Sequence, residues 1–397
     1  MKALSKTVCT MDRSPIRVML DSAARFSDAI HLEIGQPDFP TPVHIVEAAV
    51  RAARLGYTAY TANAGIVELR DAIAVKLARE NAMQAGRENI MVTVGAMQAV
   101  YLSMHVLLEP GDEILLPDPG YGNFLMATNL LHAVPVSYPT PAAMGFMPDL
   151  DALERLVTGR TKALLLNSPC NPTGAVFSRE VMRACLDFCR RHDLYLISDE
   201  TYDRLVFEGE HFSPGQWDDE GRVISIFTCS KTYSMTGWRV GYAVGSRAVI
   251  AAMSKIQEPM ASCVNTIAQH AAVTALLGPQ DCVQAMRDEY RRRRDLAVRV
   301  AEEQGLHVSY PHGAFYMLVD ITEQPLDSLA FAQELLEAKR VAVGPGCAFG
   351  PLCDQYIRIS LCCGEDALRE GITRLGHHLR ERAAEANRVR LVQPALV

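Results

Sequence analysis

Between residues 90 and 244, short apolar segments alternate with longer segments in which apolar residues recur every three or four positions. The short segments predict buried strands, and the longer ones predict amphipathic helices. We expect the strands at 90–94, 113–116, 133–138, 163–167, 194–200, 223–227 and 240–244. Near-continuous apolar strands separated by helices are typical of a mostly parallel sheet that is covered on both faces. The chain is therefore predicted to have an α/β fold with a central sheet and flanking helices.

The pattern changes beyond residue 246. We expect helices at 281–304, 327–338 and 365–386, and short strands at 315–321, 341–344 and 355–361. These elements predict a second, smaller α/β domain. The predicted division is an N-terminal arm that contributes to the small domain over 1–44, a large domain over 45–288 and the small domain over 289–397. From Ala383 onward the pattern is weak, and the tail is expected to fray.

The composition is that of an ordinary globular protein, with 49% hydrophobic and 21% charged residues. The net charge of −7 gives no electrostatic reason to expect nucleic acid or an anionic membrane as a partner. One basic run, Arg291 to Arg294, would circle a helix, and we expect it to be solvated. The N-terminal residues carry charges throughout and no apolar run is long enough to cross a bilayer, so neither a secretory signal nor a membrane span is predicted.

The 11 cysteines are scattered without the spacing of a disulfide framework. Largely buried thiols in a reducing compartment are expected, which predicts a cytoplasmic protein. Cys185 and Cys189 lie four residues apart on a predicted helix near His192. They could hold a metal, but no second cluster of ligands accompanies them. We therefore expect both thiols to face the core, and no metal site is predicted.

Lys231 follows the predicted strand 223–227 and begins a polar turn. Ligands of parallel α/β sheets bind outside the carboxyl ends of the strands. Three further residues are predicted at the same edge: Gly95, Asn171 and Asp199. Burial and a nearby cation such as Arg239 both lower the pKa of a lysine, which is how a Schiff-base lysine is activated. Taken alone, Lys231 is more simply a solvated loop residue.

A phosphate seat is predicted where Gly95-Ala-Met97 begins a helix, because the first backbone N–H groups and the positive end of the helix favour an anion. Arg239 could add a permanent cation and Thr228 a hydroxyl to the same seat.

Asp199 lies at the end of a buried strand, where a carboxylate is costly unless it meets a cation. That cation could be a protonated ring nitrogen or the partner of a structural ion pair. Asn171, Tyr202 and Tyr121 follow neighbouring strands. Their side chains could hydrogen-bond to a flat ring or stack on it.

These residues belong to a series of motifs that extends from about residue 14 to 380. Two of the motifs are Asn167-Ser-Pro-Cys-Asn-Pro-Thr-Gly174 and Ser230-Lys-Thr-Tyr-Ser-Met-Thr-Gly-Trp-Arg239. The others occupy 34–39, 60–70, 92–95, 110–112, 198–202, 313–316, 345–346 and 358–360. In this order they resemble the class I/II aminotransferases, fold-type I enzymes that use pyridoxal 5′-phosphate. The resemblance implies that the large domain binds this cofactor.

The resemblance also assigns roles around the cofactor ring. Lys231 would hold the cofactor as a Schiff base and then move a proton between the substrate α-carbon and the cofactor. Asp199 would keep the pyridine nitrogen protonated, so that the ring acts as an electron sink. Asn171 and Tyr202 would bond the ring hydroxyl, and Tyr121 would stack on the ring. Of these residues, Lys231, Asp199 and Tyr202 are the predicted catalytic group.

Further roles concern the phosphate, the substrate and the assembly. The residues implied to hold the phosphate are Gly95, Ala96, Met97, Thr228, Arg239 and Tyr60 of the partner subunit. Arg358 would bind the substrate α-carboxylate as a bidentate fork, helped by Asn171 and the backbone of Gly35. The family implies a homodimer with shared active sites.

Three positions depart from the usual pattern. Thr228 replaces the usual serine or glycine three residues before the lysine, and its hydroxyl can still reach a phosphate. Cys170 precedes Asn171 where many relatives have another polar residue. Met97 stands where relatives selective for acidic amino acids place a lysine, and a thioether would not attract a distal carboxylate. We therefore expect a neutral or aromatic amino acid to be favoured over an acidic one.

The predicted function is that of an aminotransferase that moves an amino group from an amino acid to a 2-oxo acid, such as 2-oxoglutarate or pyruvate, by ping-pong exchange. The same scaffold and cofactor support an alternative, a lyase, cyclase or other synthase. The choice depends on side chains such as Ile16, Arg17, Tyr233 and Phe349, which the sequence does not place. A third reading, the sensing half of a transcription regulator, would need an N-terminal DNA-binding domain, for which a match that begins near residue 14 leaves no room.

Overall fold

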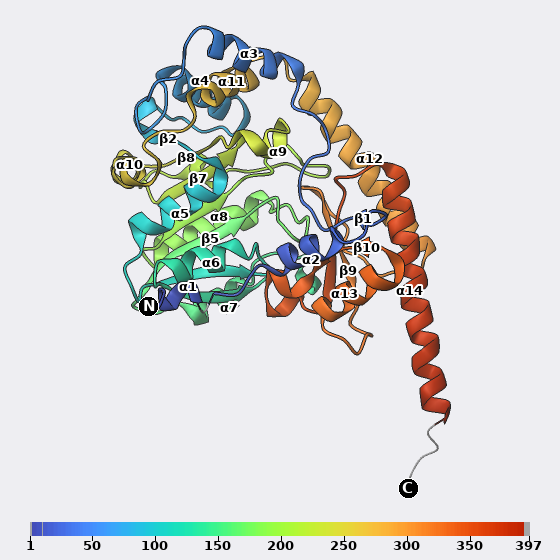
Figure 1. The fold of residues 1–397 in the computed structure, drawn as a ribbon. Helices are drawn as coiled ribbons and strands as arrows, with labels where there is room; N and C mark the ends of the chain where they lie inside the picture. The colour runs from blue at the N-terminus through green and yellow to red at the C-terminus, as the bar shows by residue number, and fades with distance from the viewer. Residues whose placement is uncertain (1, 10, 393–397) are drawn as a thin grey trace. The chain divides into compact units, whose positions relative to one another are not determined.

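The computed structural model describes residues 2–9 and 11–392, with side chains up to residue 385, and Figure 1 shows its elements. The chain forms two compact units. Unit 1 comprises Met1–Asp12, Gln36–Asp288 and His312–Ala314. Unit 2 comprises Arg13–Gly35, Glu289–Pro311 and Phe315–Val397.

Unit 1 contains the large sheet. Its strands are β2 Ile90–Thr93, β3 Glu113–Asp118, β4 Val134–Pro139, β5 Thr161–Asn167, β6 Tyr195–Asp199, β7 Val223–Thr228 and β8 Gly241–Val244. Among the described residues these seven strands form one sheet in the order β2-β8-β7-β6-β5-β3-β4. Strands β3 to β7 are mutually parallel, whereas β8 is antiparallel to both of its neighbours. The prediction of a mostly parallel central sheet is confirmed.

Helices cover both faces of this sheet. They are α3 Val43–Arg54, α4 Val67–Glu80, α5 Gly95–Leu107, α6 Asn123–Leu130, α7 Leu150–Leu156, α8 Arg179–Arg191, α10 Arg247–Ala261 and α11 Thr266–Leu277, with the short turns α1 Lys6–Cys9 and α9 Cys229–Thr232. Several begin at a residue whose side chain accepts a hydrogen bond from the first turn, as Ser178, Ser246 and Asn265 do. Such caps satisfy backbone N–H groups that a helix leaves without partners.

Alternation along the strands divides the core into two layers. Val92 and Phe227 pack in a cluster with α3, α4 and α11, which lie together in Figure 1. Met91 and Ile226, the neighbouring residues, pack on the other face with α5 and α10. Successive side chains of a strand point to opposite faces, so a strand that is apolar at every position must be covered on both sides.

Unit 2 contains two small sheets. Its strands are β1 Ile30–His31, β9 Tyr316–Asp320, β10 Val341–Ala342, β11 Gly344–Pro345 and β12 Tyr356–Ser360. In the described part of the chain β1 pairs with β10 in parallel, and β12 lies between β11 and β9 in an antiparallel sheet. Its described helices are α2 Pro15–Ala23, most of α12 Asp281–Glu303, α13 Ser328–Lys339 and α14 Glu365–Val392. The expected fraying from Ala383 is wrong as far as Val392, where the helix continues; residues 393–397 lie outside the described residues.

The basic run on α12 (Asp281–Glu303) also differs from expectation. Arg291 and Arg292 are exposed, but Arg293 and Arg294 are buried, with exposed fractions of 5% and 1%. They follow the buried Tyr290 by three and four positions, so they share its side of the helix. The Nη1 atom of Arg294 donates to the carbonyl oxygen of Pro311 at 2.7 Å. Half of the run is therefore structural rather than solvated.

Candidate active site

The parallel strands of unit 1 end at one edge of the sheet, which we call the carboxyl edge. Asn167 ends β5, Asp199 ends β6 and Thr228 ends β7. The register places Asn167 opposite Asp199, and Thr228 opposite Gly241, the first residue of β8. Polar strand ends are thus adjacent across the middle of the sheet. The predicted residues Gly95, Asn171 and Lys231 follow β2, β5 and β7, with Gly95 at the start of α5, Asn171 in a turn and Lys231 in α9.

The start of α5 and the guanidinium of Arg239 lie against each other. Gly95 begins α5 with φ of +75°, and a Cβ atom at this position would overlap the Arg239 guanidinium. A Cβ atom on Gly241 would meet the backbone of Gly95 and Ala96 at 2.6 and 2.7 Å. The residue before the helix, Val94, has no side-chain acceptor to cap it. A positive helix end beside a guanidinium fits a phosphate.

Arg239 is held in place by its own loop. Its backbone is left-handed, with φ of +57°, and Nη1 donates to the carbonyl oxygen of Thr236 at 2.8 Å. Beside it lies a pocket of about 630 Å³ whose lining includes Thr41, Val94 and Trp238. Trp238 Nε1 donates to Thr41 Oγ1 at 3.0 Å, which fixes one wall. The cation therefore borders an open space rather than the packed core.

Lys231 is carried by α9, the short helical turn that directly follows β7. The Thr228 hydroxyl caps this turn, since Oγ1 accepts from the backbone N–H of Ser230 at 3.1 Å and donates to the carbonyl oxygen of Val240 at 2.9 Å. Lys231 itself is half-buried. Its charge acts on Asp199 at the end of the neighbouring strand, because it lowers the pKa of that carboxyl group.

Asp199 is a buried carboxyl group whose ionisation is disfavoured. Its pKa is raised to about 6, mainly because of burial and to a smaller extent because of the neighbouring Glu200, while bonds from Thr201 and the charge of Lys231 oppose the rise. Thr201 donates twice to Oδ1, from its backbone N–H at 3.1 Å and from its hydroxyl at 2.5 Å. A carboxylate in this condition would be stabilised by a cation that bound nearby.

Asn171, Tyr202 and Tyr121 are the predicted ring contacts. Asn171 and Tyr202 are buried in unit 1, with exposed fractions of 5% and 4%. Asn167 positions the first of them: its Oδ1 accepts from the Asn171 N–H at 2.9 Å, and its Nδ2 donates to the carbonyl oxygen of Asp199 at 3.1 Å. Tyr121 lies in the loop after β3, where its hydroxyl oxygen accepts from Asn123 Nδ2 at 2.9 Å.

Arg358 and Gly35, the predicted substrate residues, belong to unit 2. Arg358 on β12 is 2% exposed, and Nη2 donates to the carbonyl oxygen of Glu33. Its guanidinium lies 4.3 Å from the ring centre of Tyr316 and 4.8 Å from that of Phe349. A Cβ atom at Gly35 would overlap the Tyr316 ring, so only glycine fits there. Arg358 is thus a desolvated cation in a fixed orientation.

Two predicted residues are exposed or half-exposed in unit 1. Tyr60 is 89% exposed, and Met97 on α5 is half-buried. Cys185 and Cys189, in contrast, are fully buried in the core, as expected.

No group of three or more metal-ligating side chains gathers among the described residues. The described helices also include none that is both long and apolar enough to cross a bilayer.

The sequence pattern assigns no role to Thr201 or Asn167, which hold Asp199 and Asn171 in place. Asn167 ends its strand in the same way as Asp199, and this position was a usable signal. The pattern assigns no role to Lys76 either, which is 3% exposed on α4 and pairs with Asp203 in unit 1. Lys76 follows the buried Leu69 and Ile73 at the spacing of the core-facing side of the helix, so its burial was predictable in principle.

Comparisons with known proteins agree with this geometry. The model of the aminotransferase class I and II family matches residues 27–375. A probable aspartate/prephenate aminotransferase of Thermus aquaticus is 39% identical over 96% of this chain and 100% of that protein. An aspartate aminotransferase of Pyrococcus abyssi is 40% identical over 96% of this chain and 99% of its own length. The solved aromatic aminotransferase of Pyrococcus horikoshii superposes with a TM-score of 0.88 at 39% identity, over 92% of this chain and 99% of that one. The chain belongs to the class I and II aminotransferase family.

Proposed function

We propose that this aminotransferase uses pyridoxal 5′-phosphate to move the amino group of a neutral or aromatic amino acid to a 2-oxo acid by a ping-pong mechanism. The observation that carries the proposal is the pairing of two features at the carboxyl edge. Lys231 lies beside the buried carboxyl group of Asp199, and Arg239 lies against the uncapped start of α5. The first feature suits a cationic ring with a reactive carbonyl group, and the second suits a phosphate.

The residues of unit 1 divide the binding of such a cofactor among them. Its phosphate would be held by the N–H groups of Gly95, Ala96 and Met97, by Thr228 and Arg239, and by Tyr60 of the partner subunit. Asp199 would pair with the ring nitrogen, which satisfies a carboxylate that burial otherwise destabilises. Asn171 and Tyr202 would bond the ring hydroxyl, and Tyr121 would stack on the ring.

When bound, the cofactor supplies an electron sink for the pair of electrons left at the substrate α-carbon. Lys231 would anchor it and, once displaced by the substrate amine, would take the proton from the α-carbon with Nζ and return it on the cofactor side. Half-burial of Lys231 limits the water that competes for this proton. The cation of Arg358 would bind the substrate α-carboxylate, for which its fixed guanidinium is suited.

The substrate preference rests on Met97. It is half-buried in the first turn of α5, where its backbone N–H is part of the proposed phosphate seat and its side chain would face the substrate. A thioether offers no charge to a distal carboxylate, whereas it favours an apolar or aromatic group. The relatives' names include both aspartate and aromatic amino acids as substrates. The Met97→Lys variant should raise kcat/KM for aspartate relative to phenylalanine by about tenfold or more. This factor corresponds to the free energy of one hydrogen bond between the introduced ammonium group and the distal carboxylate of aspartate. Aspartate preference in the unaltered enzyme would refute this part of the proposal.

A homodimer in the cytoplasm is also part of the proposal. The exposed ring of Tyr60 has the position expected of a side chain that completes a second subunit's site. The 11 cysteines form no disulfide among the described residues, which fits a reducing compartment. Sedimentation of the purified protein tests the dimer directly.

The experiment that tests the function is an absorbance titration of the protein reconstituted with pyridoxal 5′-phosphate. Addition of a neutral or aromatic amino acid should remove the visible band of the bound cofactor, and a 2-oxo acid should restore it. Full reversal in two separate half-reactions is the expected ping-pong behaviour. Release of ammonia or of a carbon fragment, without recovery of the band by a 2-oxo acid, would instead favour a lyase or synthase.

A further inference from the structure

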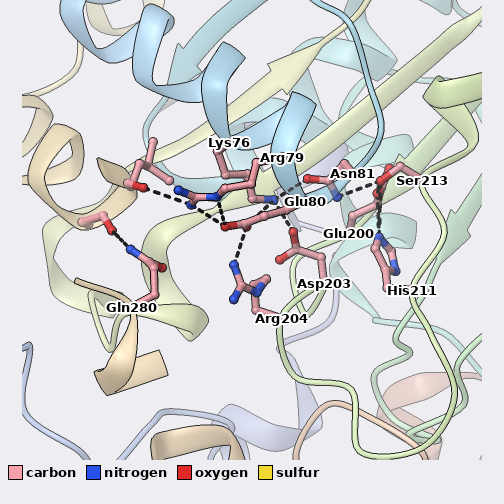
Figure 2. A network of polar contacts seen from close by, with 12 residues as sticks. Lys76, Arg79, Glu80, Asn81, Glu200, Asp203, Arg204, His211, Ser213 and Gln280 are labelled. Atoms are coloured by element: carbon pink, nitrogen blue, oxygen red, sulfur yellow. Dashed lines mark hydrogen bonds and ion pairs between the residues drawn. The ribbon is translucent and has the colours of Figure 1, made fainter. Parts of the chain in front are cut away.

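The residues that follow β6 take part in a network of buried charged and polar side chains within unit 1, which Figure 2 shows in close-up. We call residues Asp199–Arg204 the strand-end segment. The segment carries Asp199 and Tyr202, both of which have roles in the proposed function. Its other acidic residues, Glu200 and Asp203, point into the network of Figure 2. Along the segment, the proposed catalytic residues Asp199 and Tyr202 are thus each followed by an acidic residue that binds to the network.

The first anchor is the ion pair between Lys76 of α4 and Asp203. Both side chains are nearly inaccessible to solvent, at 4% and 6% exposed. Lys76 Nζ also donates to Asn81 Oδ1 at 2.7 Å and lies 4.4 Å from the ring centre of Phe227 on β7. Burial raises the pKa of Asp203, but the charges of Lys76 and His211 outweigh it, so the net shift is downward. Asp203 is therefore held as a carboxylate.

The second anchor is formed by Glu200, which is fully buried. Its Oε2 atom accepts from the Ser213 hydroxyl and lies 2.8 Å from His211 Nε2. Ser213 Oγ in turn accepts from Asn81 Nδ2 at 2.9 Å. The two anchors are thus one network, because Asn81 bonds to Lys76 on one side and to Ser213 on the other.

The network is costly as well as strong. Burying a carboxylate requires a cation or hydrogen-bond donors in a fixed geometry, and removing one partner leaves a charge without compensation. The carboxylates of Asp203 and Glu200 are both held by partners in a fixed geometry, the first by Lys76 and the second by His211 and Ser213. The network therefore fixes the backbone that carries Asp199 and Tyr202 as well as contributing to stability.

We infer that Lys76 and His211 are positioning residues for the proposed chemistry. By binding the carboxylates of Asp203 and Glu200, they fix the strand-end segment so that Asp199 and Tyr202 keep the orientation that the cofactor needs. The inference rests on the proposed function, since it concerns the residues assigned there to the ring nitrogen and the ring hydroxyl. Neither Lys76 nor His211 is assigned any contact with the cofactor or the substrate.

The test compares ion pairs at opposite edges of the same sheet. The variant Lys76→Met/Asp203→Asn removes both charges of the anchor, and such paired neutral replacements usually fold. The control, Glu113→Gln/Arg160→Met, removes an ion pair at the other ends of the strands, in which Glu113 is buried and Arg160 is exposed. The measurements are the Kd of the apoprotein for pyridoxal 5′-phosphate, the pH at which the absorbance of the bound cofactor changes, and kcat and KM.

For the anchor variant we expect Kd to rise and kcat to fall by about tenfold each, with little change in KM and a shifted pH transition. The control should change the unfolding midpoint and leave Kd, kcat, KM and the pH transition as in the unaltered protein. If the anchor variant also changes only the unfolding midpoint, the network is structural and the inference is wrong. If the unaltered apoprotein does not bind pyridoxal 5′-phosphate, the proposed function has failed instead.

A second variant keeps the test decisive if the Lys76 double variant does not fold. His211→Phe removes the donor to Glu200, whereas His211→Gln can still donate to it from an amide N–H group. We expect His211→Phe to shift the pH transition and lower kcat several-fold, and His211→Gln to restore most of both. Equal behaviour of the two variants would contradict a positioning role for the bond to Glu200.

Discussion

The two edges of the large sheet both bury a carboxyl group, and they treat it in opposite ways. At the edge where the parallel strands begin, which we call the amino edge, Glu113 of β3 is 3% exposed. It accepts from the Thr158 hydroxyl at 2.6 Å, from Arg160 Nε at 3.0 Å and from the Thr161 hydroxyl at 3.2 Å. These bonds, led by those of Thr158 and Arg160, lower its pKa in spite of burial.

Asp199 at the carboxyl edge is also buried, at 6% exposed, but among the described residues its side chain accepts hydrogen bonds from Thr201 alone, and its pKa is raised to about 6. At the amino edge, protein groups compensate the charge of the buried carboxylate. At the carboxyl edge, the buried carboxyl group is one that a cationic ligand would stabilise. The difference separates a structural ion pair from a binding site, although both lie at strand ends in one sheet. Four predictions test this comparison.

The largest effect is expected from the lysines of the two edges. Lys231 follows β7 at the carboxyl edge, whereas Lys162 is an exposed residue near the start of β5 at the amino edge. Lys231→Ala should lower kcat for transamination by about 10⁴-fold or more, because it removes both the anchor and the base. Lys162→Ala should leave kcat unchanged. The measurement is steady-state transamination with the preferred amino donor, and comparable activity of the two variants would sink the assignment of Lys231.

The second prediction exchanges the carboxyl groups for amides. Asp199→Asn should lower kcat by about 10²- to 10³-fold, the usual loss when a preorganised electrostatic group is removed. Glu113→Gln should leave kcat unchanged and lower the free energy of unfolding by about 1–3 kcal/mol, because its donors lose a charged acceptor. Kinetics and urea unfolding of both variants provide the check. A loss of activity in Glu113→Gln at full occupancy of cofactor would show that the edges are not independent.

Much of this arrangement could be predicted from the sequence. All seven strands of the large sheet lie within about two residues of the predicted positions. The agreement arises because strands of a parallel sheet are buried on both faces and therefore appear in the sequence as short, nearly continuous apolar runs. The rule that ligands bind outside strand carboxyl ends then located Lys231 and Asp199 at one edge. The residue roles came from the resemblance to aminotransferases, since neither a lone lysine nor a lone aspartate reveals its chemistry.

The remainder depends on pairings that no local pattern contains. Lys76 and Asp203 are 127 residues apart, and the hydrogen bond between them arises only after α4 has packed beside β7. Arg293 and Arg294 looked like part of a solvated run, yet the register of α12 turns them inward. In each case a charged residue occupies a buried position because a distant partner compensates it, and the sequence does not name that partner.

The third prediction concerns the stability of the apoprotein against pH. The pKa of Asp199 is higher in the folded chain than in the unfolded chain, so its ionisation destabilises the fold as pH rises from about 4 through 6. Asp199→Asn cannot ionise and so avoids this loss of stability. The free energy of unfolding of the variant, relative to that of the unaltered protein, should therefore increase across that pH range by at most about 3 kcal/mol. Urea unfolding at several pH values measures it.

Glu113 should show the opposite sign. Its folded pKa is lowered, so its stabilisation is present above the unfolded pKa of about 4.3 and is lost as pH falls through the folded pKa. The deficit of Glu113→Gln should therefore shrink in acid. A difference between Asp199→Asn and the unaltered protein that stays constant with pH would mean that Asp199 does not titrate in the folded apoprotein as argued.

The smallest effect is expected from the glycines of the two edges. Gly95 at the start of α5 and Gly111 in the turn before β3 both have left-handed backbones, with φ of +75° and +92°. Alanine at either position should cost about 1 kcal/mol or more in stability. A Cβ atom at Gly95 would also overlap Arg239, whereas one at Gly111 meets no atom within 4 Å. Gly95→Ala should therefore weaken the binding of pyridoxal 5′-phosphate by about tenfold, worth 1.4 kcal/mol, and Gly111→Ala should not. Because both variants carry the same kind of backbone strain, equal Kd values in a fluorescence titration of the apoproteins would remove Arg239 from the phosphate seat.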